Sequence, residues 1–284
     1  MPLVHVNEIL KHATENKYGV AAINTIDIKS IEYAIKAAEN EKVPIIVQFY
    51  PGLAGYTPLK YVAFCACDMA RNASVPVAVH LDHSPTFEIA VGGIRDGFPS
   101  VMVDGSAKPY EENVALTKSV VEVAKIWGVD VEAELGHVGS GASIDDITNS
   151  AHYTDVDQAV KFVEETGCGS LAVAVGNAHG PYVKTPKLDF DRIKALHENV
   201  KVPLVLHGCS DIPDEQMQEA VNLGMSKFNV ATENFRAYYN AMKAGVESGK
   251  YTGGVTGLLA SCEDAMVDFA ISKIRLLNPN KFSL

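Results

Sequence analysis

Eight short apolar, β-branched segments recur along the chain, and most of them are separated by a segment with helical periodicity. A strand that is apolar at every position must be covered on both faces, which is typical of a parallel sheet. The segments are GVAAIN (19–24), VPIIVQF (43–49), VPVAVHLD (75–82), SVMVDG (100–105), DVEAELG (130–136), SLAVAVG (170–176), VPLVLHG (202–208) and KFNVAT (227–232). Eight such units predict an α/β fold, a (β/α)8 TIM barrel that forms a single domain over residues 1–284.

Amphipathic helices are predicted for five of the intervening segments, because apolar residues recur there three and four positions apart. These segments cover 28–42, 109–128, 153–167, 189–199 and 212–224. Three of them end in Gly, the residue that commonly follows the last helical turn. A doubly wound sheet is the competing architecture, but no GxGxxG motif follows the first predicted strand.

Charge and composition exclude two classes of partner. The formal net charge of −11, without a stripe of Lys and Arg, argues against binding to nucleic acid. No apolar run approaches the ~18 residues of a membrane span, and the N-terminus lacks a secretory signal pattern.

The five cysteines are an odd number without a CxxC pair, as expected for reduced thiols. We therefore expect a cytoplasmic protein in which any phosphate site uses backbone amides, helix N-termini or a metal.

Polar side chains stand at the carboxyl end of nearly every predicted strand, where barrel enzymes carry out their chemistry. They are Asn24, Asp82, His83, Asp104, Glu132, Glu134, Asn177, His179, His207, Ser210, Asn229 and Thr232. Three strands bring His83, His179 and His207 to one rim, and three converging imidazoles match a catalytic zinc site with an open fourth position. A lone histidine at a strand end is more often structural, so this inference depends on the barrel. His80 lies deeper and is expected to be a core histidine.

A phosphate site is suggested by the loops HGCSDIP (207–213) and NVATEN (229–234), which lead from the last two strands into helix starts. Amides and hydroxyl groups are offered there by Gly208, Ser210, Asn229 and Thr232, and barrels commonly bind phosphate at this place. Plain helix caps are the alternative interpretation of either loop alone.

Specific motifs occur in a fixed order over almost the whole chain. They read HLDH (80–83), DGS (104–106), VEAELG (131–136), YTD (153–155), LAVAVGNAHGPY (171–182), KTPKLDF (184–190), VPLVLHGCSD (202–211) and NVATE (229–233). In this order they resemble the zinc-dependent class II ketose-bisphosphate aldolases, the fructose- and tagatose-bisphosphate aldolase type. The stretch YVKTPKLDF is most similar to the tagatose-bisphosphate branch.

The resemblance implies a Zn²⁺ ion bound by three histidines, with Asp82 beside the first of them as the proton-transferring carboxylate. The implied metal ligands are His83, His179 and His207, and Asp104 and Glu134 match carboxylates of an alternative or second metal position. The residues implied to hold the substrate and its phosphate are Asn24, Gly180, Gly208, Ser210, Ala231 and Thr232, with Asn229 at the catalytic centre. Na⁺ or K⁺ often lies nearby in this family, whose members are homodimers or homotetramers.

The implied reaction is the reversible retro-aldol cleavage of a ketose 1-phosphate or 1,6-bisphosphate to dihydroxyacetone phosphate and an aldehyde, a lyase step of carbohydrate metabolism. Zinc on the ketone would serve as the electron sink, while Asp82 takes the C4 hydroxyl proton. A Schiff-base lysine is another sink, but Lys227 is expected to open the last strand at the opposite rim. The alternative functions are a zinc-dependent barrel hydrolase and a non-catalytic subunit of an aldolase complex.

Two departures from the family pattern concern the substrate. The loop 136–155 usually carries a carboxylate that exchanges a proton with the three-carbon fragment, but here Ala142 stands near that place. Asp145 or Asp146 is the expected replacement, with His137 as a further candidate. Tyr50 occupies a position that is typically small, which predicts an altered pocket for the aldehyde half.

Overall fold

A closed barrel of eight parallel strands forms the centre of the computed structural model, which describes residues 2–249 and 254–284. The strands follow one another in chain order, and β1 closes the barrel against β8. They are β1 (Val20–Asn24), β2 (Ile45–Phe49), β3 (Val77–Ser84), β4 (Ser100–Val103), β5 (Asp130–Leu135), β6 (Ser170–Val173), β7 (Leu204–Leu206) and β8 (Met225–Val230). The predicted TIM barrel is confirmed, and each strand overlaps the segment assigned to it.

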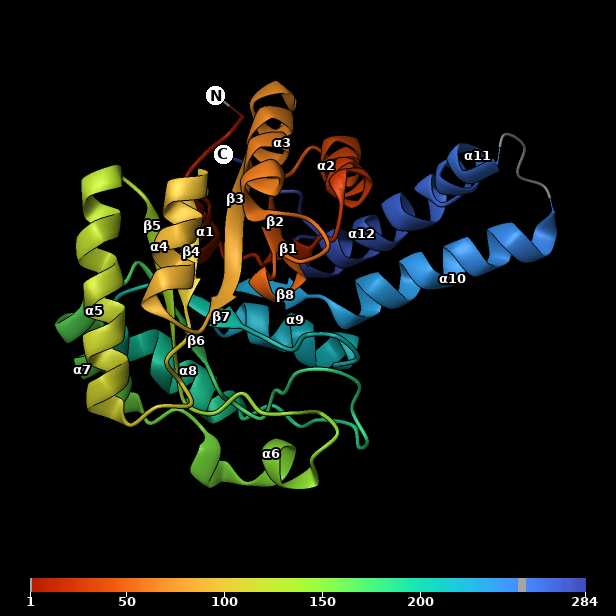
Figure 1. The fold of residues 1–284 in the computed structure, drawn as a ribbon. Coiled ribbons are helices and arrows are strands. Elements are labelled where there is room, and N and C mark those ends of the chain that lie inside the picture. Colours follow the sequence, from red (N-terminus) through yellow and green to blue (C-terminus); the bar gives the residue numbers. More distant parts are fainter. Residues whose placement is uncertain (1, 250–253) are drawn as a thin grey trace.

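Most helices of the described chain cover the outside of the barrel (Figure 1). The helices are α1 (Val6–Asn16), α2 (Ile28–Glu41), α3 (Leu59–Asn72), α4 (Phe87–Asp96), α5 (Tyr110–Trp127), α6 (Ile144–Thr148), α7 (Val156–Thr166), α8 (Phe190–Asn199), α9 (Asp214–Asn222), α10 (Thr232–Ser248), α11 (Gly254–Ser261) and α12 (Glu263–Leu277), with short 3₁₀ turns at Pro51–Leu53 and Ser150–His152. The five predicted helices correspond to α2, α5, α7, α8 and α9. Helices α3 and α4 lie between strands whose connections had no assignment from the sequence.

In strands β1 to β3 the interior of the barrel changes from apolar to polar along the strands. At the amino ends, Ala22, Ile46 and Ala78 pack against helix α1, which closes that end of the barrel. Towards the carboxyl ends the buried residues become polar, beginning with Gln48 and His80, which are paired across β2 and β3. This gradient places the ionisable side chains under the rim where barrel enzymes bind their substrates.

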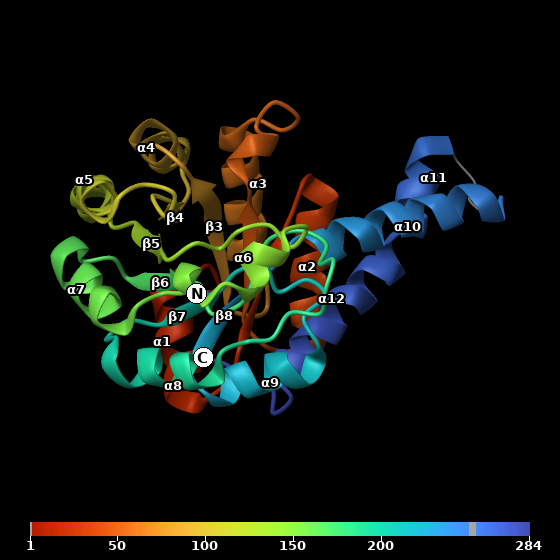
Figure 2. The same ribbon diagram turned by 90° about the horizontal axis from the view of Figure 1, so that it is seen from below.

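The long loop after β5 lies over the carboxyl end of the barrel. Both views place α6, the helix within this loop, at that end, and Figure 2 shows it in front of the strands. The two chain termini lie near each other at the opposite end. Helices α10 and α12 run outwards beyond the barrel, with α11 at their far end. In the part of the chain that is described, no helix has the length and apolar character needed to span a bilayer.

Lys227 does not open its strand, contrary to the prediction. Strand β8 begins at Met225, so Lys227 is its third residue and its side chain is fully buried. The extra residues are Met225 and Ser226, which the apolar pattern did not separate from the preceding helix and its Gly224 turn. Lys227 therefore belongs to the interior of the barrel.

Candidate active site

A cavity of about 520 Å³ opens at the carboxyl ends of the strands. It is lined by Asn24, Tyr50, Asp82, His83, Pro85, Asp104, Ser106, Ala107, Glu134, His137, Val138, His179, Gly180, Gly208, Ser210, Asn229, Ala231, Thr232 and Phe235. Most of the residues that the sequence predicted for the site therefore share one cavity. His207 is fully buried and touches the lining residue His83, whereas Asp145 and Asp146 are not part of the lining.

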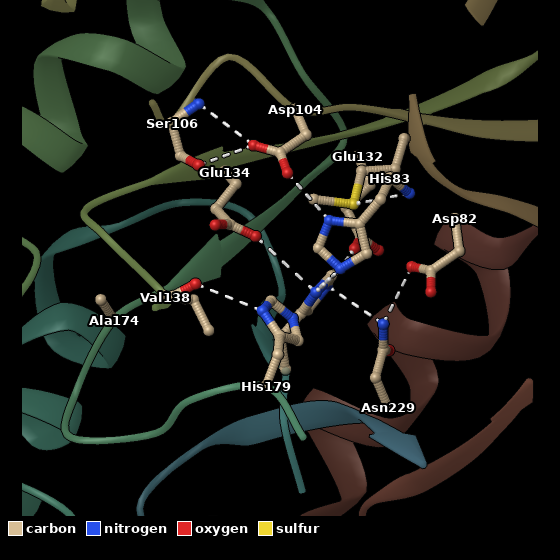
Figure 3. Close-up of polar contacts among 12 residues, drawn as sticks. Asp82, His83, Asp104, Ser106, Glu132, Glu134, Val138, Ala174, His179 and Asn229 are labelled. Carbon is tan, nitrogen blue, oxygen red and sulfur yellow. Dashed lines mark hydrogen bonds and ion pairs between the residues drawn. The ribbon is translucent and has the colours of Figure 1, made fainter. Parts of the chain in front are cut away.

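The three predicted metal ligands converge. His207 Nδ1 lies 2.8 Å from His83 Nε2, and the rings of His83 and His179 are 4.8 Å apart between centroids. One candidate ligand atom from each of the three residues lies within 4.8 Å of the other two. Figure 3 shows His83 and His179 turned towards one another. Distances of this size between ligand atoms are compatible with a single tetrahedral ion between them.

The other ring nitrogen of each histidine is held by a separate partner. Asp104 lies 2.9 Å from His83 Nδ1, the Val138 carbonyl lies 3.2 Å from His179 Nδ1, and Glu132 lies 2.9 Å from His207 Nε2. Such partners fix the tautomer and the ring orientation of metal-binding histidines. They leave Nε2 of His83, Nε2 of His179 and Nδ1 of His207 to face a metal. His179 Nε2 is buried without a hydrogen-bond partner, so this donor set fits a metal ion.

A local distortion of β3 brings both Asp82 and His83 into the cavity. Neighbouring residues of a regular strand point to opposite faces, so only one of the two would normally point inwards. His83, however, has a φ of 47°, in the left-handed region, and the pairing of β3 with β4 shifts register between Leu81 and Ser84. Strained backbone of this kind persists where the surrounding structure enforces it, often at functional sites.

Asp82 is buried and held by three amide side chains. Asn24 Nδ2 donates to its Oδ2 over 2.8 Å, Asn229 Nδ2 donates to its Oδ1 over 3.0 Å, and Gln48 adds a longer bond of 3.3 Å. Burial opposes ionisation, but the charge of His83 holds the pKa of Asp82 below its ordinary value. The carboxylate is therefore ionised and fixed in direction, and it lines the cavity; Figure 3 shows its bond from Asn229.

Asp104 and Glu134 form a second group of potential ligands with His83. Burial and the nearby charge of Asp104 raise the pKa of Glu134 to about 8, so in the absence of a metal this carboxyl is largely protonated at neutral pH. Asp104 also accepts from the backbone and hydroxyl of Ser106, and with His83 these bonds keep its pKa low despite burial. A cation bound there would need to displace the proton of Glu134.

The predicted phosphate residues line the side of the cavity beside β7 and β8. Helix α10 begins at Thr232, and the amide of Glu233 in its first turn donates to Ser210 Oγ over 3.1 Å. Gly180 has a φ of 83° and open space where a Cβ would stand, so the chain can approach a ligand closely there. At Gly208 a Cβ would lie 2.0 Å from the Ala178 carbonyl, which explains why only glycine fits between these loops.

A buried ion pair lies beneath the candidate metal ligands, and the sequence did not assign it. Lys227 Nζ contacts one oxygen of Glu132 at 2.8 Å, while the other oxygen of Glu132 holds His207. All three side chains are fully buried. His80 lies beside them with Nδ1 on the Ser100 hydroxyl at 2.7 Å, and burial lowers its pKa, so it is a neutral core histidine as expected. A lysine within a predicted barrel strand was the available signal, because lysine is rarely buried without a partner.

The loop after β5 is bound to His179, a candidate metal ligand. Its residues 138–141 pair with His179 in both directions: Gly141 N donates to the His179 carbonyl over 2.7 Å, and His179 N donates to the Gly139 carbonyl over 2.8 Å. Asp146 stabilises this turn, because its Oδ2 accepts from Ser140 N over 2.7 Å. Of the loop residues with ionisable side chains, His137 is the one that lines the cavity in the part of the chain described.

A parallel (β/α)8 barrel that gathers potential metal ligands around a cavity at its carboxyl rim has the architecture of a metal-dependent barrel enzyme. The family model for class II fructose-bisphosphate aldolase matches residues 4–281. The chain therefore belongs to the class II fructose-bisphosphate aldolase family, and it is an aldolase, a lyase. This membership decides against the barrel hydrolase and the non-catalytic subunit.

Individual relatives agree with the family. The chain is 42% identical over 231 residues to a protein of Escherichia coli K12 named uncharacterized protein YdjI, covering 81% of this chain and 83% of YdjI. It is also 42% identical over 248 residues to a fructose-bisphosphate aldolase of Geobacillus stearothermophilus, covering 86% and 85%. Crystal structures of the E. coli YdjI aldolase (37% identity, TM-score 0.86, 97% of both chains) and of a putative fructose-1,6-bisphosphate aldolase from Coccidioides immitis (28%, 0.85, 96% of both) superpose closely.

Proposed function

We propose that this aldolase is zinc-dependent and that it reversibly cleaves a ketose 1-phosphate to dihydroxyacetone phosphate and an aldehyde. The observation that carries the proposal is the convergence of His83, His179 and His207 beside the buried Asp82, in a cavity that also contains the loops after β7 and β8. Cleavage of a phosphorylated aldol needs an electron sink, a base and a phosphate-binding site, and the cavity contains candidates for all three.

The three histidines would hold the metal through the nitrogens that face one another. A site of three imidazoles with an open position suits zinc. Hard cations such as Mg²⁺ prefer oxygen ligands, so three nitrogen ligands do not suit them. When bound, the ion would polarise the ketone of the substrate and accept the electron density released as the C3–C4 bond breaks. The rings need little movement for binding, because Asp104, Val138 and Glu132 already orient them.

Asp82 would take the proton of the C4 hydroxyl group. It is ionised, it faces the cavity, and its other hydrogen bonds come from neutral amides that cannot supply a proton. Removal of this proton lets the C4 oxygen form the aldehyde carbonyl while C3 keeps the bonding electrons. Asn229 would keep Asp82 aligned, because its amide donates to the carboxylate and also lies 3.1 Å from His207 Nε2.

The phosphate end would bind where β7 and β8 lead into their helices. The proposed set is Asn24, Gly180, Gly208, Ser210, Ala231 and Thr232, all of which line the cavity. The free amides at the start of α10 and the glycine turns suit an anion. A Na⁺ or K⁺ ion beside the phosphate is part of the proposal, since the described lining contains no Lys or Arg to balance its charge.

The distal end of the substrate need not carry a phosphate. Tyr50 contributes a phenol to the cavity, and the described lining offers no Lys or Arg for a second phosphate. Arg275 is an unsuitable donor within this chain, because its guanidinium contacts Glu41 at 2.8 Å. We therefore include ketose 1-phosphates with a neutral or otherwise substituted distal end among the substrates.

A substrate panel tests the proposal. Zinc-loaded protein should release dihydroxyacetone phosphate from fructose or tagatose 1,6-bisphosphate, or from ketose 1-phosphates with a hydroxyl, carboxylate or sulfonate at the distal end. Chelation should abolish the release, and added zinc should restore it. Absence of the product from every zinc-loaded reaction would contradict the function. A strong preference for either bisphosphate would contradict only the proposed distal end.

The assembly and location follow from the same proposal. We expect a homodimer or homotetramer in the cytoplasm that binds phosphorylated ketose and neither nucleic acid nor membrane. Light scattering of the purified protein measures the first point directly.

A further inference from the structure

The reaction needs a second proton transfer, to C3, that the residues assigned so far do not supply. When C3–C4 breaks and Asp82 takes the hydroxyl proton, C3 of the three-carbon fragment keeps an electron pair and needs a proton. Among the carboxyl and imidazole groups of the cavity, Asp82 already takes the hydroxyl proton, and His83 and His179 face the proposed metal position. Asp104 is bound to His83 and Ser106. Glu134 lies 3.7 Å from His207 Nδ1 and belongs with Asp104 and His83 to the second group of potential ligands. These groups are therefore already committed.

His137 differs from the other ionisable groups of the cavity. It lines the cavity, its side chain is 49% exposed, and its ring contacts Asp146 and His152 but none of the three metal-facing histidines. Its Nε2 lies 3.6 Å from Asp146 Oδ1, and its backbone amide donates to the His152 carbonyl over 2.9 Å. A half-exposed imidazole at the mouth can exchange protons with solvent between turnovers.

The contacts of Asp146 hold it beside His137. One of its oxygens accepts from Ser140 N, so the carboxylate is anchored to the turn that pairs with His179. The other oxygen faces His137 and, at 4.0 Å, His152. The bond from Ser140 lowers the pKa of Asp146, which keeps it ionised beside the imidazole. Asp145, in contrast, has a side chain that is 69% exposed and contacts only His152 among these residues.

From this geometry we propose that His137 is the catalytic acid and base for C3, and that Asp146 is its positioning residue. In cleavage, the imidazolium of His137 gives its proton to C3, where the electron pair of the former C3–C4 bond forms the new C–H bond. In synthesis, neutral His137 removes that proton from dihydroxyacetone phosphate. Asp82 gains one proton as His137 loses one, and both exchange with water afterwards. The inference rests on the proposed function.

Two assays separate this step from C–C cleavage. Zinc-loaded protein is given dihydroxyacetone phosphate alone in D₂O, and the loss of the C3 proton signal is followed by NMR, while cleavage of the best ketose phosphate is measured separately. For His137→Gln we expect exchange to fall by about 100-fold or more, the usual contribution of a general acid or base. Zinc content, measured by mass spectrometry, should stay at the level of the unaltered protein.

Asp146→Asn and Asp145→Asn form a matched pair. Asparagine at 146 can still accept from Ser140 N, so the turn should persist while the negative charge beside His137 is lost. We expect a lower kcat with an unchanged KM in Asp146→Asn, and exchange close to that of the unaltered enzyme in Asp145→Asn. A loss in Asp145→Asn as large as that in His137→Gln would assign the proton to Asp145 and overturn the proposal.

The outcomes also distinguish this inference from the proposed function. If the unaltered protein neither cleaves nor exchanges, the proposed function fails. If it does both, and His137→Gln retains both rates with its zinc, only the role of His137 fails. Loss of zinc from His137→Gln would likewise overturn the role, because it would show that the residue acts on the metal site.

Discussion

Replacement of Lys227 by methionine should destabilise the barrel strongly. Methionine has a similar length and fits the space, but it leaves the carboxylate of Glu132 buried without its cation. The Lys227 and Glu132 side chains are both 0% exposed, and their 2.8 Å contact is charge-assisted. Removing one member of a buried pair costs about 3–5 kcal/mol, because the remaining charge loses its partner. A comparable loss in the free energy of unfolding is expected for Lys227→Met.

Denaturant unfolding of the metal-free protein measures this cost, and a double variant tests its cause. Adding Glu132→Gln to Lys227→Met removes the unpaired charge, so the double variant should be more stable than Lys227→Met alone. Lys201→Met is the matched control: Lys201 is 81% exposed and lies 3.5 Å from Glu164. An exposed pair of this kind contributes less than ~1 kcal/mol. Equal losses for Lys227→Met and Lys201→Met would refute the argument.

Three further predictions concern the site and the carboxylate of Glu41. Asp82→Asn should retain zinc yet lose at least ~100-fold in cleavage rate, since the amide cannot take the C4 hydroxyl proton; full activity would contradict the role of Asp82. Glu132→Gln should weaken zinc binding by roughly 10–100-fold in a competition titration, because His207 loses its charged partner; an unchanged affinity would contradict the orienting role. Glu41 contacts Arg275 and Lys281, whose hydrogen bonds lower its pKa. A carboxyl group whose pKa is lowered in the folded state stabilises the protein at pH values above the unfolded pKa of about 4.3. This stabilisation is lost as the pH falls through the folded pKa. The stability difference between the protein and Glu41→Gln should therefore be largest near neutral pH and shrink below about pH 4 in acid titrations; a constant difference would contradict it.

The barrel was predictable because its signal is local and repeated. A run of apolar residues predicts each strand, and a parallel sheet buries such runs on both faces. Once the barrel is given, the rim positions of Asp82, His179 and Asn229 follow from where each run ends. The side-chain partners do not follow in the same way. Whether Asp104 or Glu134 meets His83 depends on the register between strands that are many residues apart in the sequence.

Two features show what the sequence pattern could not supply. Strand alternation would turn His83 away from the cavity, and its left-handed backbone, which reverses this, leaves no signal in the residue type. The sequence of the loop 136–155 also did not show which of its ionisable groups lines the cavity. Asp145, Asp146 and His137 were all candidates, and the fold brings His137 to the cavity. Loop conformation depends on contacts such as the pairing of Ser140 with His179, which no local pattern encodes.

The ion pair under the site is best explained by the geometry of the proposed metal ligands and not by stability. Replacing a whole buried ion pair with apolar residues of similar size is often neutral or stabilising, so stability alone gives little reason to keep one. Here Glu132 has a second partner, His207, whose other nitrogen faces the metal position. An apolar residue at 132 could fill the space but could not fix the His207 tautomer, and a lone carboxylate would be costly without Lys227. The lysine is thus required by the carboxylate, and the carboxylate by the histidine. One end of this chain of contacts lies in the core of the barrel and the other in the proposed site.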